Sequence, residues 1–289
     1  MEYGRLLIIG VHILGDIIRV GLVQVSSSEN KEESMYKIRK LLERSRVEAD
    51  LLVFPEYLMA DPTGLGLEGV KASAEGLSGS WFKFFSKIAA EYGSCTVFNM
   101  FEQSGRPKPY NSTVIVSPRG EALLVYRKTH LFDALGYRES SIFEPGDVIP
   151  EPVNCNGWRV AVSVCFELRF PEIFRVHGAR RADLVVVPAA WYKGDGKEEA
   201  LRVLAQARAH ENGYYVAVSA LYGELFTGRS IIVNPFGVVE VDAGWGDRYV
   251  EHVALRSLVE EARRKYPLLE LRRTDIYASL SRILTGIFQ

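Results

Sequence analysis

The sequence contains few cysteines and no long hydrophobic run. Only three of its 289 residues are cysteine (Cys95, Cys155 and Cys165), and no Cys-x-x-Cys pair occurs. This argues against a disulfide framework and a structural zinc site, and it favours a reducing, cytoplasmic setting. The apolar stretch 6–25 is interrupted by glycine and charge, so it does not match a membrane span of roughly 18–20 residues. The start Met-Glu-Tyr-Gly-Arg also differs from the basic start of a signal peptide.

The chain also lacks an excess of either charge. It has 35 Lys and Arg residues against 36 Asp and Glu residues, and its net charge is −1. A dedicated nucleic-acid binder usually carries a basic excess, so that class is not expected. No linker rich in Pro, Gly or Ser divides the chain, so we expect one domain over residues 1–289. Within it, residues 1–16 are an N-terminal extension, and residues 255–289 form a charged, partly helical tail.

Short apolar segments alternate with amphipathic ones along the chain. The pattern predicts strands at 18–25, 51–54, 95–101, 112–116, 122–126, 159–164, 184–187, 214–219 and 231–241. It predicts helices at 30–46, 81–92 and 198–212, and a further helix that begins near Pro171. Strands mixed with helices throughout, together with hairpins, indicate a layered α/β protein.

Three polar residues stand directly after predicted strands, where clefts form in α/β sheets. They are Glu56, Lys128 and Cys165. A cysteine thiolate is a nucleophile, a partly desolvated carboxylate can take the thiol proton, and an ammonium can stabilise an oxyanion. The three residues together are a complete set for acyl transfer through a thioester.

Each of these residues also has a structural interpretation. A cysteine after Val-Ser-Val is often a small buried apolar residue. Glu56 can begin a helix, and Lys128 can be a solvated strand end. Cys95 and Cys155 lie in a strand pattern and a loop pattern, and we assign them no function.

Three sequence blocks carry a resemblance to a known family. Phe-Pro-Glu ends at Glu56, Tyr-Arg-Lys-Thr-His-Leu-Phe-Asp contains Lys128, and Cys-Phe-Glu-Leu-Arg-Phe-Pro-Glu begins at Cys165. In order and spacing these blocks resemble the signatures of the nitrilase superfamily of carbon–nitrogen hydrolases. The resemblance extends from about residue 18 to about residue 277.

The resemblance implies a fold and a mechanism. The fold would be a four-layer α-β-β-α sandwich, with homodimers or larger assemblies and the C-terminal tail in the dimer interface. Glu56 would deprotonate Cys165, which would attack an amide carbon. Lys128 and the backbone N–H of Phe166 would hold the oxyanion. Glu139, in Tyr-Arg-Glu, would position Lys128 or the hydrolytic water.

Some residues depart from the family pattern or leave alternatives open. Family amidases usually have Cys-Tyr-Asp and nitrilases Cys-Trp-Glu, whereas this chain has Cys-Phe-Glu at 165–167. The following Arg-Phe-Pro-Glu is amidase-like and favours amides over nitriles. Tyr57 and Trp191 are candidate substrate contacts, although Trp191 is equally well explained as a core aromatic. We do not expect His130 or His210 to act as the catalytic base.

A literal Gly-x-Gly-x-x-Gly lies at 64–69, far from the strand at 51–54 and from the helix expected at 81–92. A dinucleotide site needs this motif directly between a strand and a helix. We therefore expect a flexible loop near the pocket entrance instead.

The expected function is hydrolysis of a small amide to a carboxylate and ammonia, without metal or cofactor. A nitrilase, an N-carbamoyl hydrolase and a non-catalytic interaction module of the same fold are the alternatives. The expected partners are a small amide or nitrile and a second copy of the chain, and neither nucleic acid nor membrane.

Overall fold

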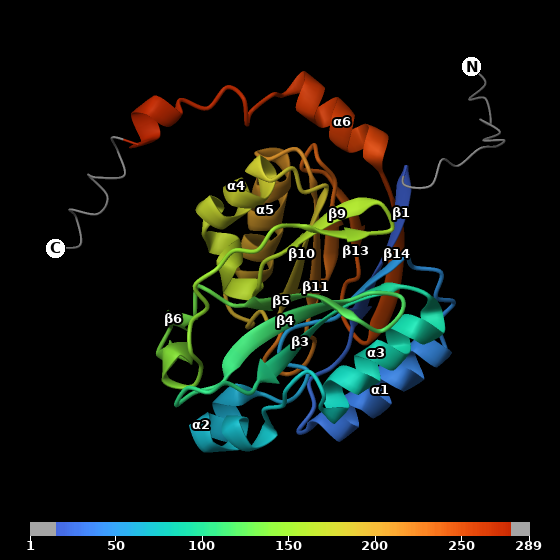
Figure 1. The fold of residues 1–289 in the computed structure, drawn as a ribbon, viewed down its shortest axis with the longest axis vertical. Helices are drawn as coiled ribbons and strands as arrows, with labels where there is room; N and C mark the ends of the chain where they lie inside the picture. Colours follow the sequence, from blue (N-terminus) through green and yellow to red (C-terminus); the bar gives the residue numbers. More distant parts are fainter. Residues whose placement is uncertain (1–15, 279–289) are drawn as a thin grey trace.

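The computed structural model describes residues 16–278, so most of the expected N-terminal extension (1–16) and the end of the tail lie outside the described residues. Two six-stranded mixed sheets form the centre, and helices cover their outer faces (Figure 1). The predicted four-layer α-β-β-α sandwich is confirmed.

The first sheet has the strand order β14-β1-β2-β3-β4-β5. Its strands β1, β2 and β3 are parallel, and the neighbours at both ends are antiparallel. The bounds are β1 Ile17–Gln24, β2 Leu51–Val53, β3 Cys95–Glu102, β4 Tyr110–Val116, β5 Ala122–Arg127 and β14 Arg248–Leu255. β2 and β3 are buried along their whole length, as their continuous apolar sequences require.

The second sheet has the order β13-β12-β11-β10-β9-β8, with β9, β10 and β11 parallel. The bounds are β8 Val153–Cys155, β9 Trp158–Val162, β10 Leu184–Ala189, β11 Tyr215–Ala220, β12 Ile231–Val233 and β13 Val239–Asp242. A two-stranded ribbon, β6 Asp133–Ala134 with β7 Tyr137–Arg138, follows the first sheet. Short 3-10 helices span Glu139–Ser141 (η1) and Cys165–Arg169 (η2).

Two helices pack on the outer face of each sheet. α1 (Lys31–Glu43) and α3 (Ser80–Tyr92) cover the first sheet, and α4 (Pro171–Ala179) and α5 (Lys197–His210) lie beyond the second (Figure 1). Asn30 begins α1 by accepting a hydrogen bond from the N–H of Glu33 at 3.0 Å, and Gly93 ends α3 at a left-handed φ of 64°. No helix described between residues 16 and 278 is both long and apolar enough to cross a membrane.

The predicted elements are confirmed to within a few residues, but residues 64–69 were predicted as a loop, and β6, β7, β8 and β14 were not predicted. The Gly-x-Gly-x-x-Gly segment is not a loop: it lies in α2 (Pro62–Ser73), so that prediction was wrong. Asp61 caps this helix through its bond to the N–H of Thr63, and Pro62 occupies its first turn. The glycines of this segment have low helix propensity, so the sequence pattern did not predict the helix. Gly66 interrupts the helix with a φ of 61°. The unpredicted β14 pairs with β1 over eight residues, and α6 (Arg256–Lys265) forms the helical part of the tail.

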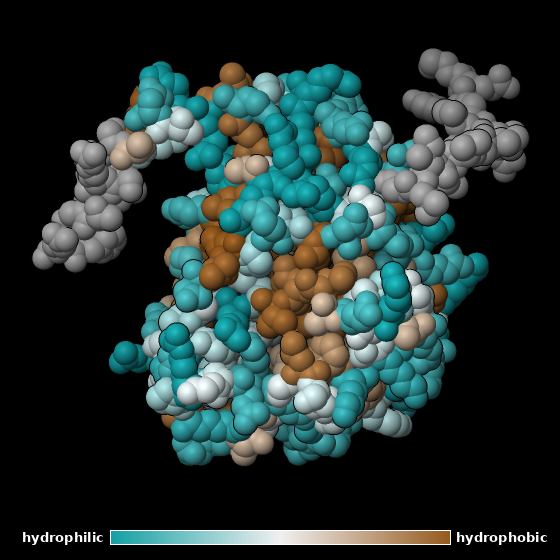
Figure 2. Space-filling model, in the orientation of Figure 1, coloured by the Kyte–Doolittle hydropathy of each residue, from teal (hydrophilic) through white to brown (hydrophobic). Residues whose placement is uncertain are grey.

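The surface is mostly hydrophilic, but hydrophobic side chains gather at the centre of the face shown in Figure 2. Leu123 on β5 and Val148 are among the exposed large apolar side chains of the described residues. The two cores are built mainly from apolar side chains, and Glu56, Lys128 and Glu139 are among the charged side chains that are also buried.

Candidate active site

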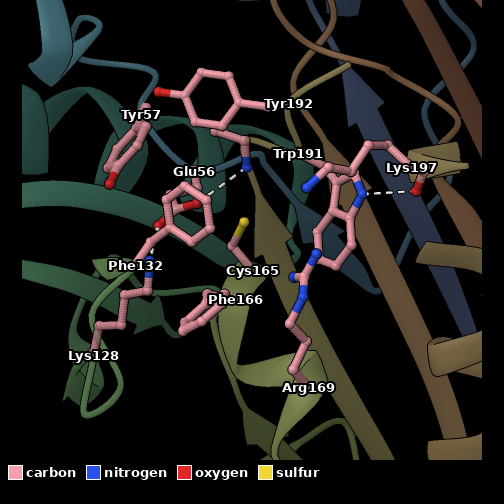
Figure 3. Close-up of a pocket in the computed structure, with 11 residues that line it drawn as sticks. Glu56, Tyr57, Lys128, Phe132, Cys165, Phe166, Arg169, Trp191, Tyr192 and Lys197 are labelled. Carbon is pink, nitrogen blue, oxygen red and sulfur yellow. Dashed lines mark hydrogen bonds and ion pairs between the residues drawn. The ribbon is translucent and has the colours of Figure 1, made fainter. Parts of the chain in front are cut away.

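The three predicted strand ends come together in one pocket. Glu56 follows β2, Lys128 follows β5, and Cys165 begins η2 after β9. All three line the same cavity, and in Figure 3 the sulfur of Cys165 points toward its centre. β2 and β5 belong to the first sheet and β9 to the second, so the site lies between the sheets at the carboxyl ends of these strands.

A buried cluster of charges lies at the base of this pocket. The Lys128 ammonium lies 2.9 Å from Glu56 Oε1 and 2.9 Å from Glu139 Oε2, and all three side chains are at most 1% exposed. Burial lowers the pKa of Lys128, but Glu139 and Glu56 together hold it well above its usual value. Lys128 is therefore a fixed cation, and two of its three N–H groups are directed at carboxylates.

The hydrogen bonds distinguish the two glutamates. Glu139 accepts four: from Tyr57 Oη at 2.7 Å, Asn111 Nδ2 at 2.8 Å, the N–H of Phe132 at 2.6 Å and Lys128 Nζ. A carboxylate has about four acceptor positions, so Glu139 is saturated. It therefore contacts Lys128 and leaves no position for a further donor.

Glu56 accepts only three hydrogen bonds among the described residues. Its Oε1 accepts from Lys128 Nζ and from Asn111 Nδ2 at 2.8 Å, and its Oε2 accepts from the N–H of Ala190 at 3.0 Å. One position on Oε2 is left, and the thiol of Cys165 interacts with this carboxylate. Glu56, and not Glu139, therefore has the capacity to take a proton from the thiol.

Cys165 stands at a sharp turn of the chain. Its φ of 43° places it in the left-handed region, which is strained for a residue with a Cβ. Burial and the Glu56 carboxylate raise the pKa of the thiol, while Lys128 and the Ala190 N–H lower it. The resting group is thus a protonated thiol in contact with a base. The N–H of Phe166, in the first turn of η2, has no acceptor within residues 16–278 and is free to bind an oxyanion.

Glu167 ties the cysteine turn to the lysine loop. Its Oε1 accepts from Tyr126 Oη at 2.7 Å, from the N–H and hydroxyl of Thr129 at 2.8 Å each, and from the N–H of His130 at 3.2 Å. Its Oε2 accepts from the N–H of Val164 at 2.8 Å. One buried carboxylate therefore fixes the segment after Lys128 against the segment before Cys165, which gives a structural role to the unusual Cys-Phe-Glu.

Aromatic and cationic side chains complete the pocket, which encloses about 360 Å³ including its opening. Trp191 lines the pocket and is also a buried aromatic. Tyr57 lines the pocket and donates its hydroxyl to Glu139. The remaining lining residues are Phe132, Phe166, Arg169, Ala190, Tyr192 and Lys197.

Sequence reasoning missed Asn111, which donates to both glutamates. Asn111 stands near the start of β4, and its residue partner on the antiparallel β3 is Phe101, near the end of that strand. The start of β4 therefore lies at the same sheet edge as the ends of the parallel strands. Arg169 was also missed as a pocket residue, although it lies four residues after Cys165 in the sequence.

Neither histidine considered in the sequence lines the pocket. His130 Nδ1 lies 2.9 Å from the Thr129 hydroxyl, and His210 on α5 contacts the ring of Tyr266. Within residues 16–278, no group of three or more His, Cys, Asp or Glu side chains is arranged to hold a metal ion.

Comparison with known proteins identifies the family. The family model described as carbon-nitrogen hydrolase matches residues 19–264. The chain belongs to the carbon–nitrogen hydrolase family, also called the nitrilase superfamily.

Two relatives and one solved structure illustrate the similarity. The chain is 32% identical over 244 residues to Hydrolase Rv0480c of Mycobacterium tuberculosis, covering 78% of this chain and 85% of that protein. It is 27% identical to the deaminated glutathione amidase of Bos taurus over 285 residues, which are 92% of this chain and 85% of that protein. A crystal structure of a carbon-nitrogen hydrolase from Helicobacter pylori G27 superposes with a TM-score of 0.84, covering 92% and 98% of the two chains at 22% identity. The buried cluster of Glu56, Glu139 and Lys128 is consistent with the catalytic triad of this family.

Proposed function

We propose that this carbon–nitrogen hydrolase is a thiol amidase that cleaves small amides through a thioester on Cys165. The observation that carries the proposal is the unequal hydrogen bonding of the two buried glutamates. Glu139 is saturated and holds Lys128, whereas Glu56 keeps one acceptor position beside the thiol.

The first half of the reaction forms the thioester. As the sulfur of Cys165 attacks the amide carbon, its proton passes to Glu56. The net charge of the buried cluster does not change when the proton moves, because one carboxylate is neutralised as one thiolate forms. The oxyanion on the former carbonyl oxygen accepts from the third N–H of Lys128 and from the N–H of Phe166. Glu56 then returns the proton to the leaving nitrogen, the C–N bond breaks, and ammonia departs.

The second half regenerates the thiol. Glu56 takes a proton from water, the hydroxide attacks the thioester carbon, and the C–S bond breaks as the sulfur recovers the proton. The products are a carboxylic acid and the free enzyme, so atoms and protons balance. General acid–base catalysis of this kind contributes about 10²–10⁴-fold.

Amides are favoured over nitriles by the amidase-like sequence after Cys165 and by the amidases among the relatives of the chain. The test is ammonia release from a panel of small amides, ω-amides, carbamoyl amino acids and nitriles. The variant Cys165→Ala is measured beside the matched control Cys95→Ala.

We expect turnover of amides that Cys165→Ala abolishes and Cys95→Ala retains. Turnover of nitriles alone would show that the protein is a nitrilase, and turnover of carbamoyl amino acids alone would show that it is an N-carbamoyl hydrolase. A fully folded protein that turns over none of these compounds would favour the non-catalytic module.

We also propose that the chain forms a homodimer or a larger assembly. A hydrophobic patch on an otherwise polar face, as in Figure 2, is typical of a contact surface. The expected contacts also involve the tail that begins at α6.

A further inference from the structure

Two cysteines that the proposed reaction does not use meet in the core between the sheets. Cys95 is the first residue of β3 in the first sheet, and Cys155 is the last residue of β8 in the second. Both belong to the same cluster of buried residues, and they are 1% and 0% exposed. The side chain of Cys95 is a hydrogen-bond partner of the Cys155 thiol, so the two sulfur atoms are in direct contact.

The alternation of side chains along β3 turns Cys95 toward the second sheet. Successive side chains of a strand point to opposite faces of the sheet. Cys95 and Val97 belong to the cluster that contains strand residues of both sheets, whereas Phe98 and Met100 belong to the cluster beneath α1 and α3. The Cys95 thiol therefore faces the second sheet.

A tight turn fixes Cys155 on the opposite side of this core. Cys155 pairs with Trp158, the first residue of β9, across the two residues Asn156 and Gly157. Both turn residues have a positive φ, 50° and 83°, which is the geometry of a type I′ hairpin. The N–H of Gly157 also donates to Asn154 Oδ1 at 2.9 Å. The position of Cys155 is therefore set by the register of a two-residue hairpin.

One aspartate joins the two cysteine segments independently of the thiols. The backbone oxygen of Asp50 accepts a hydrogen bond from the N–H of Cys95 at 2.9 Å, and its Oδ1 accepts from Asn156 Nδ2 at 2.9 Å. Its Oδ2 accepts from the N–H of Arg19 at 2.8 Å, which anchors the carboxylate to β1. Asp50 therefore holds the start of β3 beside the turn that follows Cys155.

The cysteine pair lies at the end of the sandwich opposite the catalytic pocket. Cys95 is level with Leu51, the first residue of β2, and Cys155 is level with Trp158, the first residue of β9. The catalytic residues follow the other ends of the same two strands. A covalent bond between the paired thiols joins the two sheets without reaching Cys165.

We propose that Cys95 and Cys155 form a disulfide that locks the two sheets together and stabilises the folded protein. The bond closes a loop of about 60 residues, and a cross-link over a loop of this length stabilises mainly by restricting the unfolded chain. The inference goes beyond the amidase and does not depend on it.

Oxidised glutathione is the oxidant for this bond. The thiolate of one cysteine attacks a sulfur of oxidised glutathione and forms a mixed disulfide, and one reduced glutathione leaves. The thiolate of the other cysteine attacks the protein sulfur of the mixed disulfide, the bond between the two cysteines forms, and the second reduced glutathione leaves. The two thiol protons end on the two glutathione molecules, so electrons and protons balance.

Burial decides when this reaction takes place. The hydrogen bond with Cys95 and burial both raise the pKa of Cys155, so its reactive thiolate is scarce in the folded protein. Glutathione also has no access to a core in which both side chains are at most 1% exposed. The bond therefore forms while the chain folds, and the same burial protects it from reduction afterwards.

The test is to refold the reduced protein from urea in a mixture of oxidised and reduced glutathione, and to compare it with protein refolded in dithiothreitol. Cys165→Ala is measured beside the unaltered protein, because it leaves Cys95 and Cys155 as the only cysteines. We expect the oxidised sample to lose the mass of two hydrogen atoms and to yield a non-reduced peptide that joins the two cysteines. Its Tm should lie about 5–10 °C above that of the reduced sample.

Cys95→Ala and Cys155→Ala are the matched controls, and neither should gain stability in the oxidising mixture. Each comparison is made within one variant, so the packing that a variant loses does not affect it. Two thiols that stay reduced in the oxidising mixture, or a bond between Cys95 and Cys155 that does not raise the Tm, would overturn the proposal. None of these measurements requires turnover, so the disulfide and the amidase stand or fail separately.

Discussion

The sharpest structural prediction concerns Glu167, which links the two catalytic segments. Substitution by glutamine replaces one of its two acceptor oxygens with an NH₂ group. Two fixed backbone donors face Oε1, the N–H groups of Thr129 and His130, and one faces Oε2, the N–H of Val164. In either orientation of the glutamine amide, its NH₂ group faces at least one backbone N–H. Both groups are donors, so no hydrogen bond can form between them.

The magnitude follows from that mismatch. The less costly orientation loses the bond from Val164, leaves that buried N–H unsatisfied, and removes the charge from the other bonds. A hydrogen bond to a charged group contributes about 1.5–3 kcal/mol, and an unsatisfied buried donor costs about 1–3 kcal/mol. We therefore expect Glu167→Gln to lower the free energy of unfolding by about 2–4 kcal/mol. The turnover number should fall about 10–100-fold, because Lys128 and Cys165 lose their fixed relation.

Urea unfolding followed by circular dichroism measures the stability, and ammonia release measures the turnover. Glu172→Gln, an exposed change on the neighbouring α4, is the matched control. Glu167→Asp keeps the charge and should lose less than Glu167→Gln. A stability loss for Glu167→Gln within about 0.5 kcal/mol of the control would refute the reasoning, because surface substitutions usually stay within that range.

Further predictions follow from the same contacts. Asn111→Ala should lower kcat about 100-fold in the ammonia assay, because Glu56 and Glu139 each lose a donor; unchanged kcat would contradict this. Tyr57→Phe removes one of four donors from Glu139 and should cost about tenfold in kcat, less than Asn111→Ala in the same assay. Burial lowers the pKa of His177 to about 4, so the unfolded chain takes up its proton first as the pH falls. Stability should thus drop by about 3 kcal/mol between about pH 7 and 4 on account of this residue, and His177→Gln should show a smaller drop in urea titrations. Light scattering should give at least twice the mass of one chain, and a monomer mass would contradict the expected assembly.

Much of the site could be predicted because polar residues follow apolar strands. Glu56, Lys128 and Cys165 each stand at such a strand end, and the parallel strands bring two of these ends to the same edge of their sheets. Glu139 came only from the family resemblance, since its own segment is a short ribbon and a 3-10 helix.

The remaining site residues could not be found this way. Asn111 lies near the start of an antiparallel strand, so a search for polar residues at strand ends does not find it. The antiparallel pairing nevertheless places it at the same sheet edge as the ends of the parallel strands. Arg169 is an ordinary surface residue by type, and only its stack on Trp191 places it in the pocket. The helix at residues 62–73 was missed because its glycines lower helix propensity, although Asp61 and Pro62 are typical of a helix start.

The central claim is that Glu56 activates Cys165 as the nucleophile. The most direct measurement is the rate of iodoacetamide labelling at each of the three cysteines, resolved by mass spectrometry, in the unaltered protein and in Glu56→Gln. The account predicts that Cys165, which lines the pocket, reacts far faster than Cys95 and Cys155, which do not, and that Glu56→Gln removes most of this difference. Equal labelling of all three cysteines, or a Cys165 rate that does not change in Glu56→Gln, would contradict it.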